Sequence, residues 1–182
     1  MKHSWIRFKV VWGGISREIS AAPLKLNMKQ KPEICDPSEK SVQVILTDAF
    51  QLGYLLETLL GFTGAADITV STFSTGEEFL RKLIALRRIG LVRTARLFTD
   101  FKAAEKTAKI NAMLRAAYDE VRFCKNHSKV IIIEGITLPV LVLASQNQTR
   151  GNRLENYTII QSKVTAEYCL ATLNSLSTYT LI

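Results

Sequence analysis

Five polar residues in the C-terminal half of the sequence have side chains that suit phosphate chemistry. They are His127, Lys129, Ser145, Asn147 and Glu155. A neutral imidazole is a nucleophile or a base, and an ammonium and an amide can hold phosphate oxygens. A carboxylate can orient the imidazole and stabilise its cation. Their side-chain types therefore predict a phosphate-handling site.

Three apolar runs must position these residues, namely 130–133, 138–144 and 157–160. Short runs rich in Val, Ile and Leu predict buried strands. Each polar residue stands directly before or after one of these runs, so we expect them to gather where neighbouring strands end. Alternate side chains of a strand point to opposite faces, which predicts that His127 and Lys129 point the same way. The same alternation aligns Ser145 with Asn147.

The order of these residues resembles a known signature. His127-x-Lys129-x4-Glu134, then Ser145-x-Asn147, then Glu155 before an apolar run, is similar to the HKD motif of the phospholipase D superfamily. The similarity is to its small single-motif members, which are mostly bacterial nucleases.

The resemblance also implies a fold and a domain division. Strands alternate with helices from about Val42 onward, as they do in that superfamily. We expect an α/β fold, a layered α-β-α sandwich with a central mixed β-sheet of the phospholipase D/nuclease-like type. Residues 41–182 would form the phosphodiesterase domain, and residues 1–40 a separate N-terminal segment made of a strand and a linker.

The roles of the individual residues follow from the resemblance. His127 would attack phosphorus and form a phosphohistidine that water later releases. Lys129 and Asn147 would hold the non-bridging oxygens, with Ser145 as a further substrate-binding donor. Glu155 would accept the other ring N–H of His127 and fix its tautomer.

The leaving oxygen needs a proton from a second imidazole. Apart from His127 the sequence has only His3, in the N-terminal segment. The resemblance therefore implies a homodimer that brings two copies of His127 together. The paired imidazoles would titrate as one unit and give a bell-shaped pH–rate profile. This chemistry implies neither a metal ion nor a cofactor.

Four further residues belong to the motif or to its loop. Glu134 stands where the superfamily usually has Asp, and Ala144 where it usually has Gly. Strand alternation puts Glu134 on the face opposite His127, which favours a structural role for its carboxylate. Arg150 and Arg153 lie in the loop beside the site, where each is either a substrate-phosphate contact or a solvated charge.

Net charge and cysteine content restrict the partners and the compartment. A net charge of +8 favours a polyanion, although charge alone does not separate nucleic acid from an acidic membrane surface. Three cysteines without metal-ligand spacing fit reduced thiols in the cytoplasm. Arg7 and Lys9 interrupt the apolar N-terminus, which argues against a secretory signal, and no stretch is long enough to span a membrane.

The remaining expectations concern single elements. We expect a short buried strand at 42–46, and then a helix over 49–60 that Asp48 caps and Gly61 and Gly64 end. Another helix is expected over 102–118. Six basic residues are either a solvated surface or contacts that track a phosphate backbone, namely Arg81, Lys82, Arg87, Arg88, Arg93 and Arg96.

Three functions remain open at this point. The first is a metal-independent phosphodiesterase acting on DNA or RNA. The second is a catalytically weak or inactive domain that binds nucleic acid. The third, disfavoured because the sequence offers no export or membrane-anchoring feature, is a phospholipid hydrolase or transferase.

Overall fold

The structure is a computed structural model that describes residues 6–12, 15–21, 31–103, 110–137, 139–149, 151 and 153–179. His3, Arg7 and Lys9 contribute no described side chain. The chain divides into two compact units, 1–30 and 31–182. The first unit is an antiparallel hairpin of β1 (Ile6–Trp12) and β2 (Ile15–Ala21), so the strand expected near the N-terminus is present.

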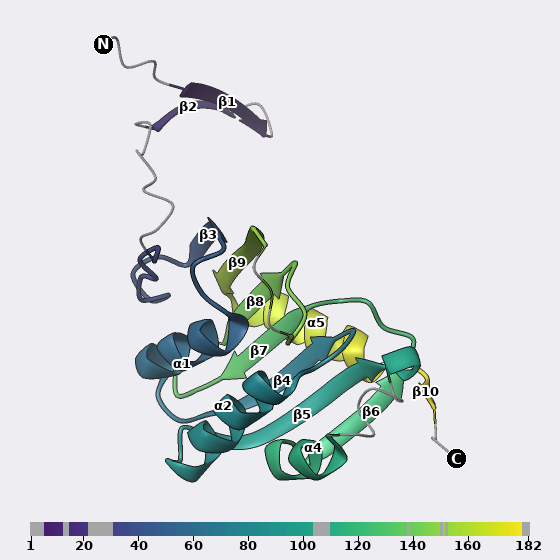
Figure 1. The fold of residues 1–182 in the computed structure, drawn as a ribbon. Helices are drawn as coiled ribbons and strands as arrows, with labels where there is room; N and C mark the ends of the chain where they lie inside the picture. The colour runs from purple at the N-terminus through teal and green to yellow at the C-terminus, as the bar shows by residue number, and fades with distance from the viewer. Residues whose placement is uncertain are drawn as a thin grey trace. The chain divides into compact units, whose positions relative to one another are not determined.

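The second unit is built on one mixed sheet with the strand order β10-β6-β5-β4-β7-β8-β9-β3 (Figure 1). The pairs β4·β5 and β5·β6 are parallel and the other pairs are antiparallel. The strands are β3 (Val42–Thr47), β4 (Ala66–Thr72), β5 (Val92–Asp100), β6 (Glu120–Cys124), β7 (Val130–Glu134), β8 (Val140–Ala144), β9 (Glu155–Gln161) and β10 (Thr178–Tyr179).

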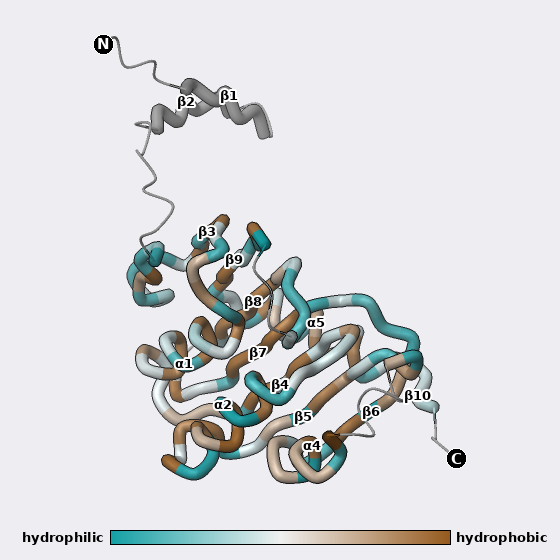
Figure 2. The backbone as a smooth tube through the Cα atoms, viewed as in Figure 1, coloured by the Kyte–Doolittle hydropathy of each residue, from teal (hydrophilic) through white to brown (hydrophobic). Residues whose placement is uncertain are grey.

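Helices cover both faces of this sheet (Figure 1). The helical elements are α1 (Leu52–Thr63), α2 (Glu77–Arg88), the 3-10 turn η1 (Phe101–Ala103), α4 (Asn111–Ala117) and α5 (Lys163–Asn174). Ile131 and Ile133 of β7 pack into a core with α1, α2 and α4, whereas Ile132 between them packs into a second core with α5. Hydrophobic residues accordingly follow one another along the central strand β7 (Figure 2), as expected for a strand that is covered on both faces. The expected α-β-α sandwich around a mixed sheet is confirmed.

The two ends of the strands form two different edges of the domain. Ser71 near the end of β4 is opposite Val130 at the start of β7, and Leu143 near the end of β8 is opposite the same residue. Thr47 at the end of β3 is opposite Glu155 at the start of β9. The residues before β7, after β8 and at the start of β9 therefore share one edge, which we call the site edge. The other, where β4 begins and β7 ends, we call the far edge.

Strand β3 differs from the expected buried strand. It is the last strand of the sheet, and its residues alternate between buried and exposed positions. Val42, Val44 and Leu46 are 60%, 68% and 60% exposed, while Gln43, Ile45 and Thr47 face the interior. An apolar run does not reveal whether a strand has a neighbour on both sides, so the prediction of burial on both faces was wrong.

Helix α1 begins later and ends later than expected. Its N-cap is Gln51. The backbone N–H of Leu52 donates to the side-chain oxygen of Gln146 at 3.0 Å and not to Asp48. Gly61 lies inside the helix, and the chain leaves it at Gly64, whose φ of 72° suits glycine. A polar side chain about a hundred residues away has taken the capping position that the sequence suggested for Asp48.

The region expected to be one helix over 102–118 is not a single described helix. The structure has η1 at its start and α4 at its end, and residues 104–109 lie outside the described residues. Leu114 and Ala117 are buried in the core, as their spacing predicted. Each helix within the described ranges is too short or too polar to cross a membrane.

Candidate active site

His127 and Lys129 lie side by side at the site edge, in the connection that leads from β6 into β7. The Lys129 Nζ is 3.1 Å from the His127 Nδ1 and donates to the His127 carbonyl oxygen at 2.7 Å. An ammonium has only donors, so in this arrangement Nδ1 carries the lone pair of the imidazole. Partial burial lowers the pKa of Lys129, while the Glu155 carboxylate opposes this shift. The two side chains therefore point the same way, as predicted.

The ring of His127 is exposed, but the backbone beside it is firmly held. Phe73, just after β4, packs against the imidazole with a ring-centroid separation of 5.3 Å. The side chain of Asn126 is only 7% exposed and binds three neighbouring segments. Its Nδ2 donates to Ser71 Oγ (2.8 Å) and to the Phe98 carbonyl (3.1 Å), and its Oδ1 accepts from Ser128 N (2.9 Å).

Asp100 completes this buried network at the end of β5. Its Oδ2 accepts from the backbone N–H of Asn126 at 2.9 Å. The hydroxyls of Ser128 and Ser71 are also hydrogen-bonded to each other, so Ser128 points away from Lys129, as strand alternation predicted. These hydrogen bonds hold the connection that carries His127 and Lys129 against β4 and β5.

Glu155 and Ser145 form a second pair at the same edge. The Ser145 hydroxyl donates to Glu155 Oε2 and accepts from the Asn156 N–H at 3.0 Å. A hydroxyl has one proton, so this bond uses the only donor of the Ser145 side chain. Tyr157, behind Glu155, is buried, and its pKa is raised by burial and then by the Glu155 charge. The substrate-binding role expected for Ser145 stays a prediction, and it requires the hydroxyl to leave Glu155.

Asn147 lies apart from Ser145. The chain leaves β8 at Ala144, so strand alternation no longer applies. The Asn147 Oδ1 is 3.4 Å from the Thr72 hydroxyl, whose proton goes to the Ser74 carbonyl at 2.9 Å. Two buried glutamines fix the backbone on either side of it. Gln146 accepts from the Tyr157 hydroxyl at 2.7 Å, and Gln148 accepts from the Tyr118 hydroxyl at 3.1 Å.

The other expected site residues divide between the two edges. Glu134 ends β7 at the far edge, opposite Asp67, and its carbonyl accepts from Arg93 at 3.2 Å. This position agrees with a structural role and not with contact to substrate. Arg153 is exposed in the loop between β8 and β9, and Arg150 lies outside the described residues. In the part of the chain that is described, no three His, Cys, Asp or Glu side chains are grouped to hold a metal ion.

The basic residues for which the sequence left a solvated surface or a phosphate track open are mostly bound to protein groups. Arg87 makes a two-pronged contact with Asp119 at 2.7 Å for each oxygen, and Arg93 donates to Asp67 at 2.6 Å. These bonds lower the pKa of both carboxyl groups. Arg81 and Lys82 also have carboxylate partners. Arg87 and Arg93, which lie at the far edge, are therefore already paired, which favours the surface alternative for these two residues.

Several residues that hold the site were not identified from the sequence. Asn126, Asp100, Gln146 and Gln148 are polar, yet all are nearly buried. Gln146 and Gln148 lie beyond the end of β8, where strand alternation gives no signal for their burial. The positions of their partners, far away in the sequence, gave no signal.

A comparison with protein-family models finds no match, and a comparison with curated protein sequences finds none either. Solved structures do match. The chain is similar to NucT from Helicobacter pylori with a TM-score of 0.54 and 17% identity, covering 76% of this chain and 99% of that one. It is also similar to polyphosphate kinase from Porphyromonas gingivalis, with a TM-score of 0.54, 13% identity and coverage of 85% and 28%.

A third match is phosphatidylserine synthase from Haemophilus influenzae Rd KW20, with a TM-score of 0.54 and 11% identity over 75% of this chain and 36% of that one. At such identities the similarity concerns the path of the backbone. It agrees with the mixed sheet and its two helical layers. The second unit therefore has the phospholipase D/nuclease-like fold.

Proposed function

We propose that this protein is a metal-independent phosphodiesterase that cleaves nucleic acid through a phosphohistidine intermediate. The observation that carries the proposal is the placement of His127, Lys129 and Glu155 at one edge of a phospholipase D/nuclease-like sheet. Proteins of this fold include a polyphosphate kinase and a phosphatidylserine synthase, whose names denote chemistry at phosphate groups. The net charge of +8 favours nucleic acid as the polyanion.

The first step is attack of a His127 ring nitrogen on phosphorus, which forms a P–N bond while the bond to the leaving oxygen breaks. When phosphate binds, the ammonium of Lys129 turns from the ring to the non-bridging oxygens, and Asn147 donates to them as well. The other ring nitrogen then carries a proton and donates a hydrogen bond to the Glu155 carboxylate. Ser145, bonded to Glu155, holds that carboxylate in place.

The leaving oxygen takes its proton from a second imidazole, supplied by His127 of a second copy in a two-fold dimer. Water then attacks the phosphohistidine, the P–N bond breaks, and the second imidazole receives the proton of that water. Measurement of native mass tests the dimer, which we expect at twice the chain mass. A monomer that cleaves with full activity would exclude this arrangement.

The test of the reaction is cleavage of labelled single-stranded DNA, duplex DNA and RNA in excess chelator, run with the wild type and with His127→Ala. We expect cleavage of at least one of them by the wild type, and its loss in the variant with binding retained. A labelled phospholipid serves as the control substrate, and cleavage of that lipid alone would favour a phospholipid hydrolase or transferase.

A specific observation favours a second candidate function, binding of nucleic acid without cleavage. The His127 Nδ1 faces the Lys129 ammonium, and the hydroxyl proton of Ser145 goes to Glu155, so four polar groups of the site are engaged in two pairs. Binding to all three nucleic acids with no cleavage of any of them, in the wild type as well as in the variant, would support this candidate.

A further inference from the structure

A cleft of about 280 Å³ opens on the α1 and α2 side of the site edge, next to the residues described above. The residues after β8 form one wall, and the first turns of α1 and α2 form the others. The lining residues on which the argument rests are Lys31, Phe50, Gln51, Tyr54, Lys82 and Asn147. Ligand pockets commonly measure about 300–1,000 Å³, so this cleft suits a single ring system.

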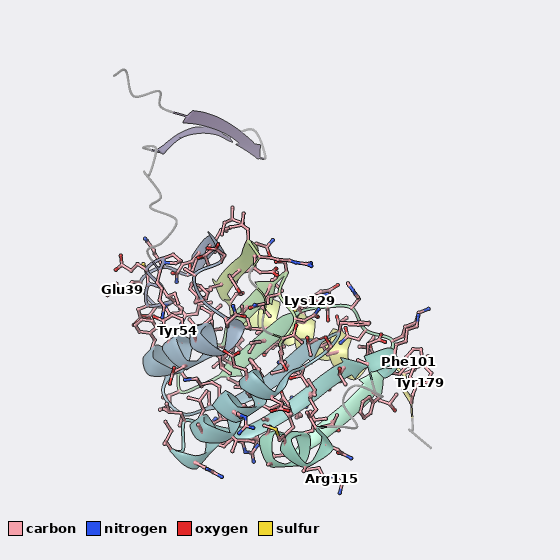
Figure 3. All side chains as sticks on the ribbon, in the orientation of Figure 1. Glu39, Tyr54, Phe101, Arg115, Lys129 and Tyr179 are labelled. Carbon is pink, nitrogen blue, oxygen red and sulfur yellow. The ribbon has the colours of Figure 1, made fainter. Side chains whose placement is uncertain are left out.

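Aromatic rings provide much of its apolar surface. Phe50 and Tyr54 pack with their ring centroids 5.6 Å apart and their planes tilted by 41°, and Phe50 packs in turn on the buried Tyr157 at 5.1 Å. Tyr54 is 36% exposed, while Phe50 is 4% exposed. Figure 3 shows Tyr54 on α1 and Lys129 at the start of β7. The aromatic stack is thus rigid at its base and accessible at Tyr54.

A positive charge lies on the accessible ring. The Lys31 Nζ is 4.3 Å from the centroid of the Tyr54 ring. The other cation of the lining, Lys82, donates to Glu57 at 2.9 Å. Within the described ranges Lys31 has no carboxylate partner. Its long side chain is flexible, so the ammonium can exchange the ring for an anionic group.

Asn147 joins this cleft to the proposed catalytic groups, because it lines the cleft and is also a residue expected to hold phosphate oxygens. Its Oδ1 is 3.4 Å from the Thr72 hydroxyl, and its amide N–H groups have no partner within the described residues. A nucleotide whose phosphate is held by Asn147 therefore has the cleft beside it. Aromatic side chains bind nucleobases by stacking, without preference for sequence.

We infer that the cleft is a nucleobase subsite, in which one unpaired base next to the scissile phosphate stacks on Tyr54. The ammonium of Lys31 moves from the ring to the neighbouring phosphate when the base enters. The position of the phosphate in this inference rests on the proposed function. The stacking of a base on Tyr54 does not. It deepens that function by requiring the base to leave any helical stack before cleavage.

Binding separates the inference from the proposed function. In the His127→Ala background, fluorescence anisotropy is measured with a labelled oligothymidylate and with an abasic strand of the same length and charge. We expect the oligothymidylate to bind more tightly, and Tyr54→Ala to weaken its binding about 5- to 150-fold, the range of one lost base stack. Tyr54→Phe should bind like the parent, because the ring is kept. The abasic strand should bind with equal affinity to the parent, to Tyr54→Ala and to Tyr54→Phe.

The matched control is Tyr168→Ala, which removes an exposed tyrosine (72% exposed) from α5 on the other face of the sheet. It should leave both affinities unchanged. Equal affinity for the two strands, or equal binding by Tyr54→Ala and its parent, would overturn the inference even if the wild type cleaves nucleic acid. Conversely, a wild type that cleaves nothing but shows the Tyr54-dependent difference would refute the proposed function and leave the subsite standing.

Discussion

The two edges of the sheet carry similar polar residues but use them differently. At the far edge, arginines are joined to carboxylates in half-exposed pairs, as in Arg87 with Asp119 and Arg93 with Asp67. At the site edge, the polar side chains that hold the backbone are buried, as Asn126 is, Lys129 is half-buried, and the other cations named below are exposed. Pairing neutralises these two arginines, whereas several exposed cations of the site edge have no carboxylate partner within the described residues and can meet a polyanion.

Three exposed cations illustrate this difference. They have no carboxylate partner within the described residues. One follows β5, one follows β6 and one precedes β9. These residues are Lys102, Lys125 and Arg153. A count of basic residues in the sequence does not identify such free cations, because it does not include the carboxylates that neutralise the others.

The comparison predicts the largest effect on stability for the buried network of the site edge. Asn126→Ala leaves Ser71 Oγ and the carbonyl of Phe98 without this amide donor and removes the acceptor for Ser128. We expect the free energy of unfolding to fall by about 2–4 kcal/mol, measured by urea denaturation.

Asn156→Ala is the matched control. Asn156 is exposed, and its described hydrogen bonds are made by its backbone. We expect a change within about 0.5 kcal/mol. Equal losses in the two variants would show that the buried network does not carry the stability assigned to it.

The next effect concerns binding of nucleic acid. Replacing the three exposed cations of the site edge by glutamine should weaken binding and reduce the slope of log K against log salt by about 2 to 3, if each contacts one phosphate. The measurement is a salt titration of affinity with a labelled oligonucleotide. It requires no cleavage and is carried out in the His127→Ala background.

The matched triple variant removes the same charge from cations that are paired. The residues replaced are Arg87, Arg93 and Arg122, whose partners are Asp119, Asp67 and Glu120. We expect its salt slope to equal that of the parent. If both triple variants lose the same slope, net charge alone governs binding and the comparison between the edges fails.

The smallest effect is the contribution of one far-edge pair to stability. The Arg87 guanidinium lowers the pKa of Asp119 below its ordinary value of 3.8, so the pair stabilises the folded state above that pH and ceases to do so as the pH falls through the lowered value. Because both side chains are partly exposed, we expect Arg87→Gln to cost about 0.5–1 kcal/mol at pH 7. The difference from the wild type should shrink below pH 3.8.

Arg115→Gln is the control for that pair, since Arg115 is exposed on α4 and has no carboxylate partner within the described residues (Figure 3). Its unfolding free energy should follow that of the wild type at every pH. A pH-independent difference for Arg87→Gln would mean that the ion pair is not its cause.

The sequence predicted the layers of the fold and the edge at which the site residues meet. Apolar runs such as 130–133 are a local property, and the rule that polar residues gather where strands end needs only the order of the elements. Prediction from the sequence failed where the structure of a segment depends on contacts with residues far away in the chain. That β3 lacks an outer neighbour, that Gln146 caps α1, and that Asp119 takes Arg87 are all decided by contacts between segments far apart in the chain.

The same limit applies within the candidate site. Lys129 beside His127 follows from a spacing of two residues, and the structure has this contact. The bond between Ser145 and Glu155 requires β8 and β9 to be paired in a particular register, which the sequence does not state. Burial of Asn126 was equally hidden, because nothing local distinguishes a buried asparagine from a loop asparagine.

The most direct test of the central claim, that His127 at the site edge cleaves phosphodiesters without a metal, is the rate of nucleic-acid cleavage in excess chelator. We predict that the wild type retains its rate and that His127→Ala loses roughly 10⁴-fold or more, the scale seen when a covalent nucleophile is removed. Binding of the oligonucleotide should be unchanged. Cleavage that stops in chelator, or that persists in His127→Ala, would contradict the account.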